Sequence, residues 1–78
     1  MPTLLRIGPY RFYFYSHEPN EPPHVHVDRD DCTAKLWLAD TAVAQNIGFS
    51  ARELRVLQSH TAAHRAAFEQ AWHDFFGA

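Results

Sequence analysis

The sequence predicts an α+β domain: a small antiparallel sheet of three to four strands, followed by one long or two shorter C-terminal helices packed on one face. Residues 3–39 carry short segments that alternate with the period of two typical of strands, whereas residues 50–76 follow the helical period of about 3.6 residues. Strands that precede helices favour a sheet covered on one side. A chain of 78 residues is too short to divide, so we expect a single domain over 1–78 with a modest core.

Four segments carry the strand pattern. Leu4–Ile7 forms a short strand, and the Gly8-Pro9 turn joins it to a second strand over Arg11–Ser16. A polar, proline-rich segment follows and is expected to be a loop, because prolines fix φ and remove backbone donors. The third strand then covers His24–Asp28. A charged turn then leads to a fourth strand over Cys32–Ala39.

The helical part begins after residues 40–47, which fit either a short helix or an irregular crossing. Ser50 and Glu53 have the spacing of a capping box, and Phe49 and Leu54 have that of a hydrophobic staple. One apolar stripe then runs to the end of the helix, and a break near residues 59–61 would give two helices. The stripe contains Leu54, Leu57, Thr61, His64, Phe68, Trp72 and Phe75.

Strand parity sorts the side chains of the sheet into two faces. The apolar face, expected to meet the helices, contains Leu5, Ile7, Phe12, Phe14, Val25, Val27, Leu36 and Leu38. The opposite face, here called the imidazole–aromatic face, contains Arg6, Arg11, Tyr13, Tyr15, His24, His26, Lys35 and Trp37. Because an antiparallel sheet can leave one face in water, we expect this second face to be open to solvent.

The imidazole–aromatic face has chemistry that suits RNA. Histidines titrate near neutral pH, so His24 and His26, together with Tyr13, are candidate acid–base groups for attack by a ribose 2′-hydroxyl. Such a reaction would be a ribonuclease-like activity without a metal or other cofactor. The candidate binding residues, which would hold phosphates or stack on bases, are Arg6, Arg11, Tyr15, Lys35 and Trp37.

Two other interpretations stay open. Tyr, Trp and Arg are also enriched in protein interfaces, and the net charge of −2 provides no general basic field for nucleic acid. The same face could therefore serve a non-enzymatic protein-interaction module. The second alternative is a histidine-based metal site joining the strand pair to His60 and His64, which have helical i, i+4 spacing. His64 lies on the stripe that faces the other side of the sheet, so the sequence favours no metal.

The remaining features concern compartment and partners. Cys32 is the only cysteine, which excludes an internal disulfide and fits a reducing cytoplasm. No secretory leader is recognisable, and no apolar run approaches the roughly 20 residues of a membrane span. We therefore expect a cytoplasmic protein without membrane contact. Since the core is small, a homo-oligomer or a protein partner would add stability.

Five segments together resemble the bacterial domain-of-unknown-function family 4160. They are Arg6–Ser16, Pro22–Val27, Ala34–Leu38, Gly48–Leu54 and Ala71–Gly77. The resemblance spans nearly the whole chain, and it implies a small toxin–antitoxin-type component that pairs with a cognate small protein. It implies no catalytic residue. The resulting hypothesis is a component that binds a cognate protein and acts on RNA through the imidazole–aromatic face.

Overall fold

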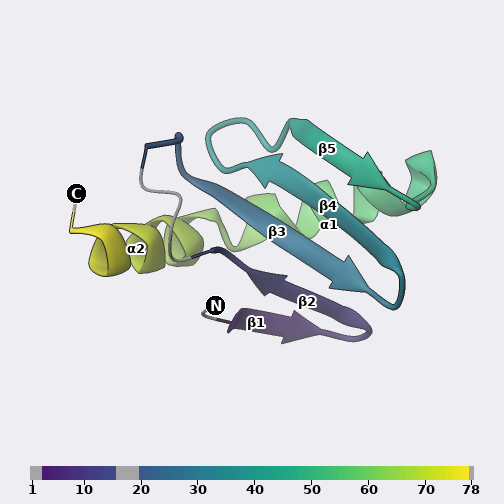
Figure 1. Cartoon of the computed structure of the whole chain (residues 1–78), viewed down its shortest axis with the longest axis horizontal. Helices are drawn as coiled ribbons and strands as arrows, with labels where there is room; N and C mark the ends of the chain where they lie inside the picture. Colours follow the sequence, from purple (N-terminus) through teal and green to yellow (C-terminus); the bar gives the residue numbers. More distant parts are fainter. Residues whose placement is uncertain (1–2, 16–19, 78) are drawn as a thin grey trace.

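The computed structural model describes residues 3–15 and 20–77, which form a five-stranded antiparallel sheet and two helices (Figure 1). Each strand pairs with its neighbour in sequence, in the order β1-β2-β3-β4-β5. The α+β class and the C-terminal position of the helices are confirmed. The elements are β1 (Thr3–Ile7), β2 (Tyr10–Tyr13), β3 (His24–Arg29), β4 (Cys32–Trp37), β5 (Val43–Ile47), α1 (Ala51–Ala63) and α2 (Arg65–Phe76).

The sheet has five strands rather than the three to four predicted, because residues 43–47 form a strand where a short helix or an irregular crossing was expected. β5 occupies most of residues 40–47, and it is largely exposed from Ala44 to Ile47. Backbone pairing with β4, rather than burial of an apolar face, holds this strand. A turn with Thr41 at φ 59° reverses the chain before it. Without a buried face, β5 lacks the alternation that identifies a strand in the sequence.

The strand boundaries shift slightly from those predicted. The second strand ends at Tyr13 rather than Ser16, and the fourth ends at Trp37 rather than Ala39. Ser16 and residues 17–19 of the predicted loop lie outside the described residues.

The strand register confirms the division into two faces. Phe12 lies opposite Val27 and Val27 opposite Ala34, whereas Tyr13 lies opposite His26 and His26 opposite Lys35. The first row faces the helices and forms the centre of the core. The buried core cluster consists of Phe12, Val25, Val27, Ala34, Leu36, Leu38, Phe49, Leu57 and Phe68.

The helical segment breaks once, at His64, a few residues after the predicted point. The start of α1 matches the predicted cap, because the Ser50 hydroxyl accepts a hydrogen bond from the Glu53 N–H at 3.1 Å. Both helices lie against one side of the sheet, and α2 continues past the ends of the strands (Figure 1). Burial of Phe68 and Trp72 anchors α2.

The connection from β5 to α1 is a tight turn that only glycine fits. The side-chain amide of Asn46 forms two hydrogen bonds with the backbone of Phe49: it accepts from the N–H at 3.1 Å and donates to the carbonyl at 3.0 Å. Gly48 has φ 95°, and a Cβ there would lie 2.9 Å from the Cys32 sulfur. This turn directs α1 back under the sheet and places Glu53 below the β3–β4 hairpin.

Candidate functional site: the imidazole–aromatic face

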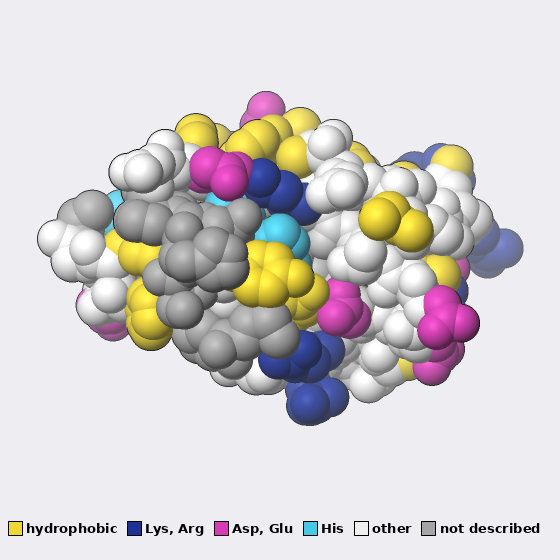
Figure 2. Space-filling model, viewed as in Figure 1, with side chains coloured by type: hydrophobic (Ala, Val, Ile, Leu, Met, Phe, Trp, Pro, Cys, Tyr) yellow, Lys and Arg dark blue, Asp and Glu magenta, His cyan; other side chains and the backbone are white. Residues whose placement is uncertain are grey.

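The imidazole–aromatic face lies on the side of the sheet away from the helices. His26 lies between Tyr13 and Lys35 across three neighbouring strands, and His24 lies opposite Trp37. Arg6 lies opposite Arg11 at the edge of the same face. Figure 2 views this side and shows histidine surface with basic and acidic groups around it. The predicted candidate residues of β1 to β4 therefore do share a face.

The centre of this face is buried, which corrects the expectation of an open surface. His24 has no exposed surface, Tyr13 is 3% exposed and His26 is 8% exposed. The peripheral members are more accessible: Arg11, Tyr15, Lys35 and Trp37 are partly buried, and Arg6 is exposed.

The buried centre is a cluster of rings around His26. The imidazole of His26 stacks on Tyr13, with centroids 5.4 Å apart and planes at 21°. The rings of Tyr15 and His24 meet it edge-on, at 4.5 Å and 5.0 Å. Contacts of this kind stabilise aromatic packing and lock side-chain rotamers. The histidine pair is therefore part of a packed layer.

His24 connects this layer to α2. Its ring lies 4.9 Å from that of Trp72 and 5.7 Å from that of Trp37. Its Nδ1 lies 2.9 Å from the carbonyl oxygen of Pro22, which can only accept a hydrogen bond, so Nδ1 carries a proton and donates. An acid–base group must come within hydrogen-bond reach of the substrate, and His24 is closed off from solvent here.

Tyr13 is held as a hydrogen-bond donor. Its hydroxyl donates to Asp28 Oδ1 at 2.9 Å, and the Thr33 hydroxyl donates to the same oxygen at 2.7 Å. The Arg11 guanidinium lies 4.5 Å from the centre of the Tyr13 ring. Burial, followed by hydrogen bonding with Tyr15 and Asp28, raises the pKa of Tyr13 above its ordinary value of 10.0. A phenol that keeps its proton suits a structural role better than that of a general base.

Two cations of the face, Lys35 and Arg11, already have polar partners. Lys35 forms an ion pair with Glu21, and its Nζ lies 4.7 Å from the centroid of the Trp37 ring. Arg11 Nε donates to the Thr3 hydroxyl at 3.0 Å. The charge of Lys35 is thus partly compensated within the chain, and this weakens its attraction for phosphate.

A hydrogen-bonded group of three side chains, which the sequence did not predict, lies on the other side of the sheet. Arg29 donates to both carboxylate oxygens of Glu53, through Nε and Nη2, at 2.8 Å each. The Tyr10 hydroxyl donates to the same carboxylate at 3.0 Å. This Arg29–Glu53–Tyr10 group links β2, the end of β3 and the first turn of α1. The capping-box spacing identified Glu53, but no local pattern pairs it with Arg29, which lies 24 residues earlier at the end of β3.

The Arg29–Glu53–Tyr10 group predicts a specific acid sensitivity. Hydrogen bonding to Arg29 holds the pKa of Glu53 below its ordinary value of 4.5. A depressed carboxyl pKa stabilises the fold above the unfolded-state pKa, and this contribution is lost as the pH falls through the folded-state pKa. Glu53→Gln should therefore lower the melting temperature at about pH 7, and its deficit against the wild type should shrink toward about pH 3.

Thermal melts followed by circular dichroism at several pH values would measure this deficit. Glu69→Gln on α2 is the matched control. A Glu53→Gln deficit of constant size from neutral to acid pH would contradict the role of the ionised carboxylate.

The two histidine pairs do not meet. His60 packs near Tyr10 and Phe12, with ring centroids 6.2 Å and 6.3 Å away, and His64 stacks on Phe68 at 5.8 Å. Both lie on the helix side of the sheet, away from the histidines of β3. Within residues 3–15 and 20–77, no three His, Cys, Asp or Glu side chains are grouped so that they could hold a metal ion. The structure thus gives no support to the histidine-based metal alternative.

Comparison with known protein families shows which family the chain matches. The family described as "Domain of unknown function (DUF4160)" matches residues 10–73, which is most of the chain. No curated protein and no solved structure matches. In the part of the chain that the structure describes, neither helix has the length and apolar character that crossing a membrane requires.

Proposed function

We propose that this chain, which belongs to the DUF4160 family of unknown function, is the protein-binding component of a toxin–antitoxin-type pair. The proposed partner is a cognate small protein, and the proposed role is non-enzymatic. The observation that carries this choice is the burial of His24 in a packed ring cluster. The toxin–antitoxin setting comes from the family resemblance.

The burial of the histidines favours binding over catalysis. A ribonuclease using His24 and His26 would need both imidazoles at the surface, beside the ribose and the scissile phosphate. His24 has no exposed surface, and His26 has little. The ring cluster would have to open before RNA could reach either group.

The periphery of the face favours a protein as the ligand. Trp37, Tyr15 and Arg11 remain partly exposed around the buried centre, and aromatic and Arg side chains dominate the energetics of protein interfaces. Trp37 contacts both His24 and Lys35 and is thereby already restrained, so less side-chain entropy is lost when a partner binds. We therefore expect the partner to contact this rim, with Arg6 at its edge.

Titration calorimetry with the purified product of the adjacent gene tests the proposal. We expect a complex that Trp37→Ala weakens by about 30-fold, the size of an interface hot spot, and that Arg6→Glu weakens by about 10-fold. Arg52→Ala, at an exposed position of α1, should leave the affinity unchanged. Melting curves of each variant alone would separate lost contacts from lost folding.

Two results would contradict the proposal. One is the absence of any complex with the adjacent gene product. The other is cleavage of RNA by the chain alone, abolished by His24→Ala with His26→Ala in a variant that still folds, since this would establish the enzymatic alternative.

A further inference from the structure

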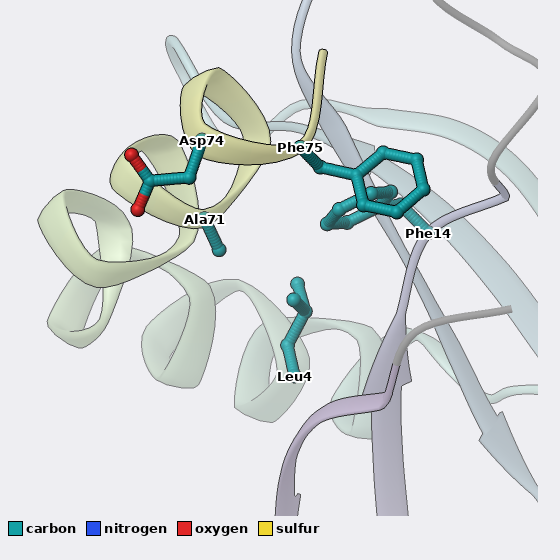
Figure 3. A pocket seen from close by; sticks show the side chains of 5 residues that line it. All are labelled: Leu4, Phe14, Ala71, Asp74 and Phe75. Carbon is teal, nitrogen blue, oxygen red and sulfur yellow. The ribbon is translucent and has the colours of Figure 1, made fainter. Parts of the chain in front are cut away.

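A shallow apolar groove separates β1 from α2. It has a volume of about 360 Å³ and is lined by Leu4, Phe14, Ala71, Asp74 and Phe75 (Figure 3). Phe75 is 49% exposed, although its ring contacts that of Phe14 at 5.4 Å. A large apolar side chain half in water at the mouth of an apolar groove is typical of a contact surface.

A bulge in β1 directs Leu4 into this groove. The register between β1 and β2 shifts between Thr3 and Leu5, so Leu4 is the extra residue. Thr3 accepts a hydrogen bond from Arg11 on the imidazole–aromatic face, whereas Leu4 lines the groove. Bulges commonly redirect a side chain in this way. β1 thus borders both the groove and the proposed binding face.

β1 is also an edge strand with an apolar character. Within the described residues it pairs with β2 on one side only, and its Leu4, Leu5 and Ile7 are half-buried. The opposite edge, β5, exposes the polar residues Gln45 and Asn46 as well as Ile47, which is 53% exposed. An edge strand presents a row of backbone N–H and C=O groups that a further strand can pair with. β1 differs from β5 in that its Leu4 lines the apolar groove, so a strand added to β1 could place an apolar side chain there.

Charge at the groove indicates the character of the occupant. Asp74 projects from the last turn of α2 at the rim of the groove and accepts from Gln70 at 2.8 Å (Figure 3). The C-terminal end of a helix carries partial negative charge, so a carboxylate there adds to a negative local field. A basic side chain on the partner would complement this field.

We infer that an extended segment of the cognate protein adds to β1 as a sixth strand, with one apolar side chain in the groove and a Lys or Arg near Asp74. This inference rests on the proposed function, because it requires a protein partner. Strand addition draws affinity from main-chain hydrogen bonds and specificity from pockets for alternate side chains. The outer edge of β1, which pairs with no other strand among the described residues, and the neighbouring groove offer both.

The test combines amide exchange with calorimetry on the full chain and the purified adjacent gene product. We expect β1 amides to gain protection from hydrogen exchange in the complex, while β5 amides do not. Phe75→Ser, and Ala71→Trp as a groove-filling change, should each raise Kd at least about 10-fold. Val56→Ser, at an apolar position 40% exposed on α1, is the matched control and should leave Kd unchanged.

The outcomes separate the two proposals. If no complex forms, the proposed function fails, and this inference fails with it. If the complex forms and responds to Trp37→Ala, but β1 gains no protection and Phe75→Ser has no effect, only the strand addition is overturned. If β1 amides become protected in the chain alone as its concentration rises, a second copy occupies the edge and the inferred occupant is wrong.

Discussion

Replacing His24 by alanine should destabilise the protein by about 2–4 kcal/mol and lower its melting temperature by roughly 10–25 °C. His24 is fully buried, and it packs against His26, Trp37 and Trp72. Alanine would leave a cavity among these rings, and the Pro22 carbonyl would lose the hydrogen bond from Nδ1. Chemical denaturation followed by tryptophan fluorescence would measure the loss.

Two companion variants make the result specific. His24→Phe keeps a ring in the cluster and removes only the hydrogen bond, so it should cost about 1–2 kcal/mol. His73→Ala changes an exposed histidine of α2 and should cost little. If His24→Ala proved as stable as His73→Ala, the packed ring cluster would not be a structural element. Any biological effect of His24→Ala must therefore be compared with its effect on folding.

Phe12→Ala should cost still more, about 3–5 kcal/mol. Phe12 is fully buried at the centre of the sheet, where its ring stacks on Phe68 of α2 at 5.6 Å and meets His60 of α1 edge-on at 6.3 Å. One side chain thus joins the sheet to both helices. Domains of this size have a total stability of about 4–12 kcal/mol, so this single substitution should remove at least about a quarter of it.

Phe75→Ala is the matched control, because it removes the same side chain from a half-exposed site. We expect it to cost no more than about 1 kcal/mol. Urea titrations of both variants give the comparison directly. Equal losses would show that the contacts of Phe12 with the two helices add nothing to the stability of the core.

The two faces of the sheet could be predicted from the sequence because alternation is a local signal. In β3, Val25 and Val27 alternate with His24 and His26, and in the structure the valines and the histidines lie on opposite faces of the sheet. β5 was not predicted because four of its five residues are exposed and it shows no alternation, so that backbone pairing with β4 is the main interaction that forms it. The helix cap at Ser50 was predictable for the same reason as the faces, since its partner lies three residues away.

The burial of the candidate site could not be predicted from strand parity. Parity assigns His24 to the face away from the helices, yet its ring touches Trp72, which belongs to the helix stripe. This contact exists because α2 runs past the ends of the strands (Figure 1). The Arg29–Glu53 pair was missed for a related reason, because its partners are 24 residues apart and meet only after the sheet and α1 have packed. A local sequence pattern carries no information about contacts between residues so far apart in the chain.

The order of the strands has a consequence for how this chain folds. Every strand pairs with the one before it, so the sheet can grow by successive hairpins with short loop closures, which favours fast folding. The apolar side of that sheet stays uncovered until α1 and α2 dock, because both helices come last in the chain. A nascent chain with β5 complete and α2 still missing lacks Phe68, on which Phe12 stacks in the folded protein. The interval before α2 emerges is therefore the period when the chain is most prone to aggregate.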